Sequence, residues 1–128
     1  MSPRIETELL NQTIEVCECY GWHVHHDRPA RTEKGWRTAI QGHAGFPDLV
    51  LAKGGWMITR ELKGRRERLS DAQWVWARKL SGDPDWIEQP DADPVERAVW
   101  LFDVWRPKDF STLIVPLLSG KLRIPTCV

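Results

Sequence analysis

Three charged residues stand at the ends of two apolar segments that a pair of glycines joins. Asp48 precedes the first segment, and Glu61 and Lys63 end the second, within GFPDLVLAKGGWMITRELK (45–63). A symmetric turn at the Gly-Gly pair predicts a β-hairpin in which Asp48 lies opposite Glu61. Directly opposed residues have Cβ atoms about 4.5–5.5 Å apart, and Lys63 points to the same face as Glu61.

Two opposed carboxylates repel each other, so the pairing needs a compensating charge. A divalent cation such as Mg²⁺ would supply that charge, because hard cations take carboxylate oxygens together with several waters. The Lys63 ammonium would help to neutralise the cluster and could orient or deprotonate a metal-bound water. The alternative is that the strands splay at these ends and the charges are solvated, and a one-residue shift in register would also separate them.

The elements that must position these residues follow from hydrophobic spacing and from turn and cap residues. The spacing predicts a helix over 4–20 that turns Leu9, Leu10, Thr13, Cys17 and Tyr20 to one face, then a strand over 22–26 and a polar loop or irregular hairpin over 27–44. After the hairpin itself, it predicts a helix over 70–82 with Ser70 as N-cap and an exposed acidic insertion over 83–97. A strand over 98–105 and a last helix from Pro107, which Pro116 ends or kinks, complete the chain. The order α-β-β-β-α-β-α indicates an α/β domain with a mixed sheet flanked by helices.

Length and composition limit the function classes. A chain of 128 residues is enough for one domain, and we expect a single domain over 1–128. No apolar segment approaches a membrane span of about 18 residues, and the N-terminus lacks a signal-peptide pattern. Cys17, Cys19 and Cys127 have no metal-type spacing, which favours a reduced cytoplasmic protein. The net charge is zero, but basic residues gather in 28–37 and 60–68, which suggests a face for a polyanion.

The motif around the hairpin resembles a known nuclease pattern. Pro47-Asp48 followed by Glu61-Leu62-Lys63 is similar to the PD-(D/E)xK motif, and GFPDLVLA with ELKGRRERLSDAQ, GWHVHHDRPARTEKGW and VWRPKDF resembles the VRR-NUC branch of that superfamily. The acidic insertion is longer than the turn that the resemblance leads us to expect. The resemblance implies a restriction-endonuclease-like core, a small stand-alone protein encoded by a phage or prophage, and Mg²⁺- or Mn²⁺-dependent hydrolysis of DNA.

The resemblance also implies roles for individual residues. Asp48, Glu61 and the Leu62 backbone carbonyl would bind the metal, and Lys63 would position the attacking water and stabilise the transition state. Related enzymes add a glutamate from the first helix. On this helix Glu6 lies at the centre of the apolar face and Glu8 on the polar side, and a carboxylate facing inward needs a partner or a metal. Glu6 is therefore our candidate.

Gln73 has two candidate roles, a capping box with Ser70 and a contact with the catalytic lysine or the attacking water as the resemblance implies. We favour the site-shaping role and expect that the two roles could compete. DNA backbone contacts are predicted for six residues, at each of which a solvated side chain is the alternative: Arg28, Arg31, Lys34, Arg37, His26 and His43.

The sequence therefore predicts a Mg²⁺- or Mn²⁺-dependent DNA endonuclease, for which branched, flap or nicked DNA are candidate substrates. A catalytically inactive DNA-binding module on the same fold is the main alternative. A zinc-stabilised interaction protein is a third, which the His-x-His-His segment (23–26) supports only weakly, because no cysteine lies near it. A homodimer would suit the cutting of two strands.

Overall fold

The computed structural model describes residues 3–26, 30–32, 35–37, 42–82 and 92–122, and side chains throughout these ranges except at 3–4, 30–32 and 35–37. The elements are α1 (Pro3–Cys19), β1 (His23–His26), β2 (Ala30–Thr32), β3 (Gly35–Arg37), β4 (Leu49–Lys53), β5 (Trp56–Leu62), α2 (Asp71–Ser81), α3 (Pro94–Val99), β6 (Phe102–Trp105), the 3₁₀-helix η2 (Pro107–Asp109), the π-helix η3 (Phe110–Ile114) and α4 (Val115–Leu118).

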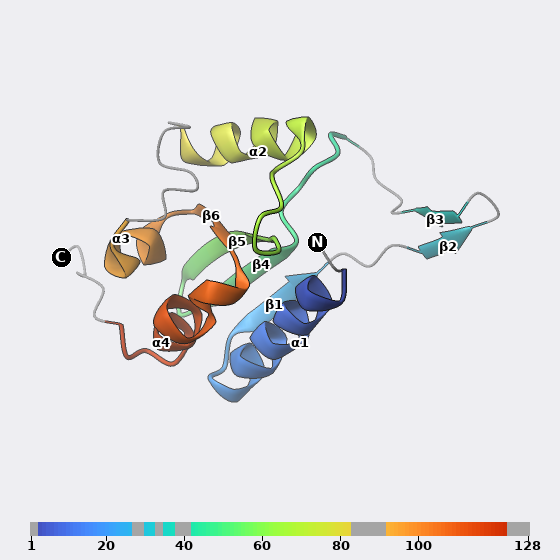
Figure 1. Ribbon diagram of the computed structural model, residues 1–128. Coiled ribbons are helices and arrows are strands. Elements are labelled where there is room, and N and C mark those ends of the chain that lie inside the picture. Colours follow the sequence, from blue (N-terminus) through green and yellow to red (C-terminus); the bar gives the residue numbers. More distant parts are fainter. Residues whose placement is uncertain (1–2, 27–29, 33–34, 38–41, 83–91, 123–128) are drawn as a thin grey trace.

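Four strands form one mixed sheet in the order β1-β4-β5-β6 (Figure 1). The β1–β4 and β4–β5 pairs are antiparallel, and β5 and β6 are parallel. The expected mixed sheet with flanking helices is therefore confirmed. The polar stretch 27–44 contributes a second, two-stranded sheet, the β2–β3 hairpin, which stands away from the main sheet in Figure 1.

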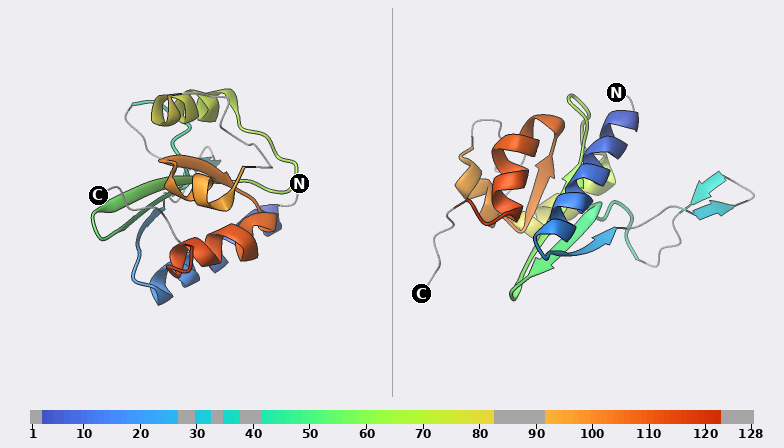
Figure 2. Two further views of the ribbon diagram at one scale, coloured as in Figure 1. Left: turned by 90° about the vertical axis from the view of Figure 1, so that its left-hand side faces the viewer. Right: turned by 90° about the horizontal axis from the view of Figure 1, so that it is seen from below.

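Helices cover both faces of the sheet (Figure 2). On one face α1 and the C-terminal helical segment pack on Ile58, Leu62 and Trp105 in the larger core cluster. On the other face α2 packs through Ala77 on Phe102 and other residues of a smaller cluster. Because side chains alternate along a strand, Ile58, Arg60 and Leu62 face α1 and α4, whereas Thr59, Glu61 and Lys63 face the other way.

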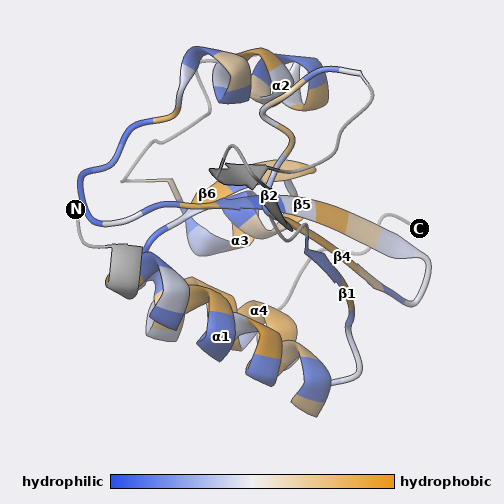
Figure 3. Cartoon of the chain, turned by 90° about the vertical axis from the view of Figure 1, so that its right-hand side faces the viewer, coloured by the Kyte–Doolittle hydropathy of each residue, from blue (hydrophilic) through white to orange (hydrophobic). Residues whose placement is uncertain are grey.

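Hydropathy follows the same layers (Figure 3). Strand β4 is hydrophobic over most of its length and β5 over part of it, and the segment that leaves β5 toward α2 is largely hydrophilic. None of the helices within the described ranges combines the length and the apolar composition that a membrane crossing requires.

Helix α1 begins and ends close to the predicted limits, and its predicted face is largely correct. Leu9, Thr13 and Cys17 are buried, and Leu10 is partly buried against the same core. Tyr20 is 43% exposed, so its assignment to this face is wrong. The physical reason is that the helix ends at Cys19 and the chain turns at Gly21, which has a φ of 79°.

The prediction of a strand from residue 98 is wrong, because 94–99 form helix α3 and the strand begins at Phe102. The Asp93 side chain caps this helix by accepting from the Val95 N–H at 2.7 Å, and Pro94 occupies its first turn. An Asp cap followed by proline is a strong helix start, which outweighed the β propensity of the residues after it. Of the predicted acidic insertion, 83–91 lie outside the described residues, and the rest contributes to α3.

The last helical segment passes through Pro116 instead of ending there. The segment starts as 3₁₀, widens to a π-helix over Phe110–Ile114, and continues as α4. A proline offers no N–H to a carbonyl in the preceding turn, so the hydrogen-bond pattern has to change around it. The wider π turn directly before Pro116 is that change.

Candidate active site

The hairpin has the predicted register. Leu49 pairs with Arg60, and the pairing continues to Lys53 with Trp56 around the Gly-Gly turn. One step beyond the first pair, Asp48 faces Glu61. The Asp48 carboxylate is held there because its Oδ2 accepts a hydrogen bond from the Leu62 N–H at 2.8 Å.

Glu61 and Lys63 are buried, with exposed fractions of 2% and 6%. The Lys63 Nζ lies 3.9 Å from Glu61 Oε1 and 3.2 Å from Glu67 Oε2. The Lys63 N–H donates to the Trp105 carbonyl at 3.0 Å, which extends the parallel pairing with β6 beyond the end of β5. These charges are therefore held inside the fold by the sheet and are not solvated strand ends.

Gln73 combines the two roles that we expected to compete. Its Oε1 accepts from the Ser70 N–H at 2.8 Å, and its N–H donates to Ser70 Oγ at 3.2 Å, which completes the capping box of α2. Its Nε2 donates to Glu61 Oε1 at 3.1 Å. The amide has separate acceptor and donor ends, so one side chain anchors the helix and orients Glu61.

The first helix contributes Glu6. This half-buried carboxyl lies close enough to Glu67, Asp48 and Lys63 to interact electrostatically with all three. Burial first, and then the charges of Glu67 and Asp48, raise its pKa to about 7. The side chain of Glu8 is exposed. The structure thus places Glu6, and not Glu8, with the hairpin carboxylates.

Glu67 belongs to the site, and sequence reasoning missed it. Its carboxylate accepts from the Lys63 ammonium and from the Glu6 carboxyl, and its pKa is lowered by these partners although burial acts in the opposite direction. The signal is present in the sequence as the four-residue spacing from Lys63. Within the basic segment RELKGRRER, however, Glu67 looks like a surface acid that pairs with the neighbouring arginines, so the sequence gives no reason to assign it to the site.

The resulting cluster is called the carboxylate site below and comprises Glu6, Asp48, Glu61, Lys63, Glu67 and Gln73. Burial, the Asp48 charge and Glu6 raise the pKa of Glu61 well above its usual range, although Lys63 acts to lower it. Glu61 Oε2 is buried and accepts from no N–H group of the described residues, and the Glu61 and Asp48 carboxyl groups lie within hydrogen-bonding reach of each other, which also raises the pKa of Glu61. Four carboxyl groups and one ammonium leave the site short of positive charge, which is the environment of a functional site.

The donor set suits a hard cation held largely through water. Within the described ranges, no three side chains of His, Cys, Asp or Glu form a ready-made metal cage. Mg²⁺ is commonly held by one or two carboxylates and keeps several waters. Asp48 and Glu61 provide two carboxylates, and the buried Glu61 Oε2, which accepts from no N–H group of the described residues, is an oxygen that such an ion would bind.

The predicted DNA contacts are spread over three parts of the chain. Arg31 lies on β2 and Arg37 on β3, both on the separate hairpin, and Arg28 and Lys34 lie outside the described residues. His26 pairs with Leu49, one residue from Asp48. His43 is exposed, and its carbonyl accepts from the Trp76 indole at 3.2 Å, which places it beside α2.

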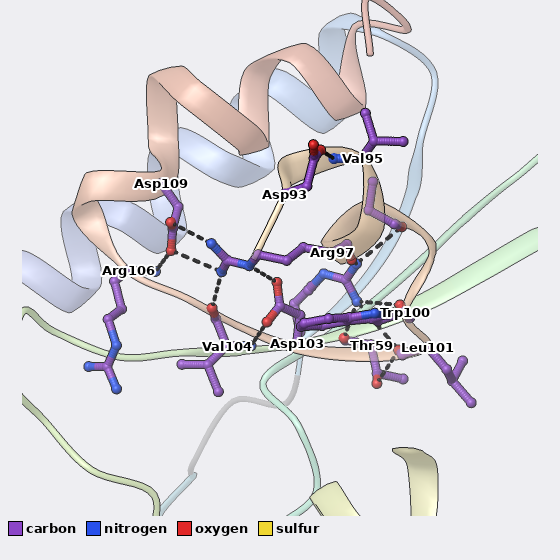
Figure 4. Close-up of polar contacts among 12 residues, drawn as sticks. Thr59, Asp93, Val95, Arg97, Trp100, Leu101, Asp103, Val104, Arg106 and Asp109 are labelled. Carbon is purple, nitrogen blue, oxygen red and sulfur yellow. Dashed lines mark hydrogen bonds and ion pairs between the residues drawn. The ribbon is translucent and has the colours of Figure 1, made fainter. Parts of the chain in front are cut away.

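A buried ionic network supports the strands that carry the site (Figure 4). Arg97 on α3 donates to Asp103 Oδ2 on β6 and to Asp109 Oδ1 on η2, both at 2.9 Å. Arg60 donates to carbonyls of the α3 end and of Trp100, and its guanidinium lies 5.1 Å from the Trp105 ring centroid. Because Arg60 directly precedes Glu61, this network fixes the backbone next to a site residue.

Arg106 joins the same region to the segment after β5. Its N–H donates to Asp109 Oδ2 at 2.9 Å, and its Nη1 donates to the carbonyls of Gly64 and Glu67. The loop that carries Glu67 is therefore fastened to the end of β6. Sequence reasoning missed this interaction, because nothing local links residue 106 to residues 64 and 67.

No protein-family model and no curated protein sequence matches this chain.

Proposed function

We propose that this chain is a Mg²⁺- or Mn²⁺-dependent nuclease that hydrolyses phosphodiester bonds in DNA, on a restriction-endonuclease-like core of the VRR-NUC type. The supporting observation is the convergence of Glu6, Asp48, Glu61, Lys63 and Gln73, which come from three elements and from the residues that flank two strand ends. The sequence predicts all five as members of one site. Three of the five are carboxyl groups that lie close together, buried or partly buried, with Lys63 as the one positive charge among the five. This arrangement favours metal-assisted phosphoryl chemistry over a structural role.

The chain's own residues have distinct tasks in this proposal. Asp48 and Glu61 would hold the ion, and the Leu62 carbonyl is the third expected ligand. Gln73 keeps the Glu61 carboxylate oriented, and the Asp48 carboxylate is oriented by the Leu62 N–H. When bound, the metal would lower the pKa of a water and offset negative charge on the scissile phosphate.

Lys63 would act on the attacking water and on the developing negative charge. Its ammonium lies between Glu61 and Glu67 at the mouth of the hairpin. A fixed cation near the phosphate stabilises a transition state in which charge accumulates on the phosphoryl oxygens. Glu6 and Glu67 share a hydrogen bond, and this pair can accept or release a proton close to the same point.

A cleavage assay tests the proposal. The purified protein is incubated with duplex, single-stranded, nicked, flap and branched DNA, each with Mg²⁺, Mn²⁺ or EDTA. We expect metal-dependent products, and we expect Asp48→Asn and Lys63→Met to lower the rate by at least about 10²-fold, the typical loss when one charge-stabilising group is removed.

The matched control is Glu15→Gln, because Glu15 is an exposed carboxylate on the helix that carries Glu6. It should cleave like the wild type, whereas Glu6→Gln should not. If every variant cleaves as fast as the wild type, the activity comes from a contaminant and the proposal fails. If DNA binds without metal and is never cleaved, the inactive DNA-binding module is the correct description.

A further inference from the structure

A basic pocket lies next to the carboxylate site. Its volume is about 410 Å³, and it is lined by Arg65, Arg106, Pro107 and Lys108. One water accounts for about 30 Å³ of liquid, so the pocket has room for a phosphate group and part of an attached sugar. As far as the chain is described, the lining contains three basic side chains and no carboxylate.

Strand pairing sets the position of this pocket relative to Lys63. Leu62 pairs with Trp105 in the parallel β5–β6 ladder, so the next step places Lys63 beside Arg106. The hydrogen bond from the Lys63 N–H to the Trp105 carbonyl shows that the pairing reaches this step. Neighbouring strands lie about 4.8 Å apart, and paired residues point to the same face. Arg106 in the pocket lining therefore directly follows the strand next to the one that leads to Lys63.

The Arg106 guanidinium is fixed before any ligand arrives. Its Nη1 donates to the Gly64 and Glu67 carbonyls on either side of Arg65. A side chain that is already immobilised loses little conformational entropy on binding, which favours affinity. Arginine is also well matched to phosphate, because its planar fork of N–H donors fits the phosphate oxygens.

Two carboxylates of the described residues in this region accept hydrogen bonds from cations outside the pocket lining. Asp109 accepts from Arg97 at 2.9 Å, and Glu67 accepts from Lys63 at 3.2 Å. Arg65 and Lys108 are exposed at the rim of the pocket. The pocket is thus lined by basic side chains and lies beside a site rich in carboxyl groups that could hold a cation, an arrangement that suits two neighbouring phosphates of one strand.

We propose that the pocket formed by Arg65, Arg106 and Lys108 binds a backbone phosphate of the DNA strand next to the phosphate at the carboxylate site. The inference rests on the proposed nuclease function, to which it adds a subsite that positions the strand. Arg106 forms the fixed wall, and Arg65 and Lys108 close on the phosphate from the rim.

Binding without cleavage tests the pocket. The anisotropy of a fluorescently labelled oligonucleotide is measured in EDTA over a range of NaCl concentrations, for the wild type and for the double variant Arg65→Ala/Lys108→Ala. We expect binding about tenfold weaker at low salt, because the variant cannot form a charge-assisted hydrogen bond to the phosphate. The slope of log K against log salt should become shallower by about 0.7 on a single strand, or 0.9 on a duplex, for each phosphate that the variant no longer neutralises.

Two controls make the result specific. Lys121→Ala removes an exposed lysine at the other end of the C-terminal helical segment and should change neither quantity. Arg106 is left intact, because its removal would also release the loop that carries Glu67. Circular dichroism melts verify that both variants are folded. If the double variant has the affinity and the slope of Lys121→Ala, the subsite does not exist.

A separate titration distinguishes a strand phosphate from a free anion. Inorganic phosphate is added to the wild type at constant ionic strength, with tryptophan fluorescence as the readout. Binding as tight as that of the oligonucleotide would make the pocket a free-anion site and overturn the proposal. If the double variant weakens DNA binding but the wild type cleaves no DNA with Mg²⁺ or Mn²⁺, the nuclease function is contradicted and the phosphate site is still supported.

Discussion

Strand β5 carries two buried ionic clusters whose charges balance differently. On the face toward α4, Arg60 belongs to the network in which Arg97 pairs with Asp103 and Asp109, two cations with two carboxylates (Figure 4). On the other face Glu61 belongs to the carboxylate site, where four carboxyl groups meet a single ammonium. The two clusters are centred on consecutive buried residues, so burial alone does not explain the difference.

The comparison indicates which cluster serves the fold. Within the network each carboxylate has a cation at hydrogen-bond distance, and burial lowers the pKa of Arg60 only to about 10, so it stays charged at neutral pH. In the carboxylate site, burial and like charges raise the pKa of Glu6 and Glu61. A protein keeps such an imbalance at the expense of stability, which is typical of a functional site.

Removing a cation from the balanced cluster should have the largest effect. Arg97→Ala leaves Asp103 and Asp109 buried without their partner, and breaking such a pair typically costs about 3–5 kcal/mol of unfolding free energy. Urea denaturation followed by circular dichroism measures it. Glu96→Gln, an exposed neighbour on the same helix, should stay within about 0.5 kcal/mol of the wild type. A destabilisation below about 1 kcal/mol for Arg97→Ala would show that the network is not important for stability.

In the carboxylate site, removal of an ionisable group should increase the free energy of unfolding instead of lowering it. Glu61→Gln replaces a buried carboxyl group, which must hold a proton in the folded state at pH 8 because its pKa is raised, by a neutral amide, so the metal-free protein should become more stable at this pH. The increase should be at least about 1.4 kcal/mol, the equivalent of one pKa unit. The same variant should lose affinity for Mg²⁺ in calorimetry, and Glu15→Gln should do neither. Destabilisation by Glu61→Gln at pH 8 would contradict the charge imbalance.

The pH dependence of stability should also separate the two clusters. The pKa of Glu6 is raised from 4.5 to about 7, so the folded state holds more protons than the unfolded state in this window. Stability from this group is full below pH 4.5 and is lost as the pH rises through about 7, and Glu61 extends this decrease to higher pH.

In thermal melts without metal, the melting temperature should therefore fall from pH 5 to pH 8. Addition of Mg²⁺ at pH 8 should restore it, because a ligand that binds only the folded state stabilises it. The double variant Glu6→Gln/Glu61→Gln should show a flatter profile. A profile in the double variant as steep as that of the wild type would assign the titration to other groups.

The smallest effect is expected at Ser70, the N-cap of α2, which lies next to the carboxylate site and is joined to it through Gln73. Ser70→Ala removes the acceptor for the Gln73 N–H and should cost about 1 kcal/mol of unfolding free energy. The Ser70 N–H still binds Gln73 Oε1, so the hydrogen bond from Gln73 to Glu61 persists and DNA cleavage should change little. Ser111→Ala, at an exposed position, is the control for stability. A large decrease of cleavage in Ser70→Ala would mean that the cap itself positions Glu61.

Much of the carboxylate site could be predicted because its geometry is local. The Gly-Gly turn sets the register that places Asp48 opposite Glu61, and helical spacing separates Glu6 from Glu8. Glu67 was missed because its role depends on how the segment after β5 folds back, and Arg106 determines that fold from a distant strand end.

The sequence by itself determined the hairpin, the helix caps and the set of residues at the strand ends, because these depend on turn chemistry and on short periodic spacing. Only the tertiary structure decided the pairing of β5 with β6, the ionic network and the basic pocket. The physical reason is that these features join residues far apart in the chain. Which residues pair across these distances depends on packing and on the burial of charged groups, and neither can be read from the spacing of neighbouring residues.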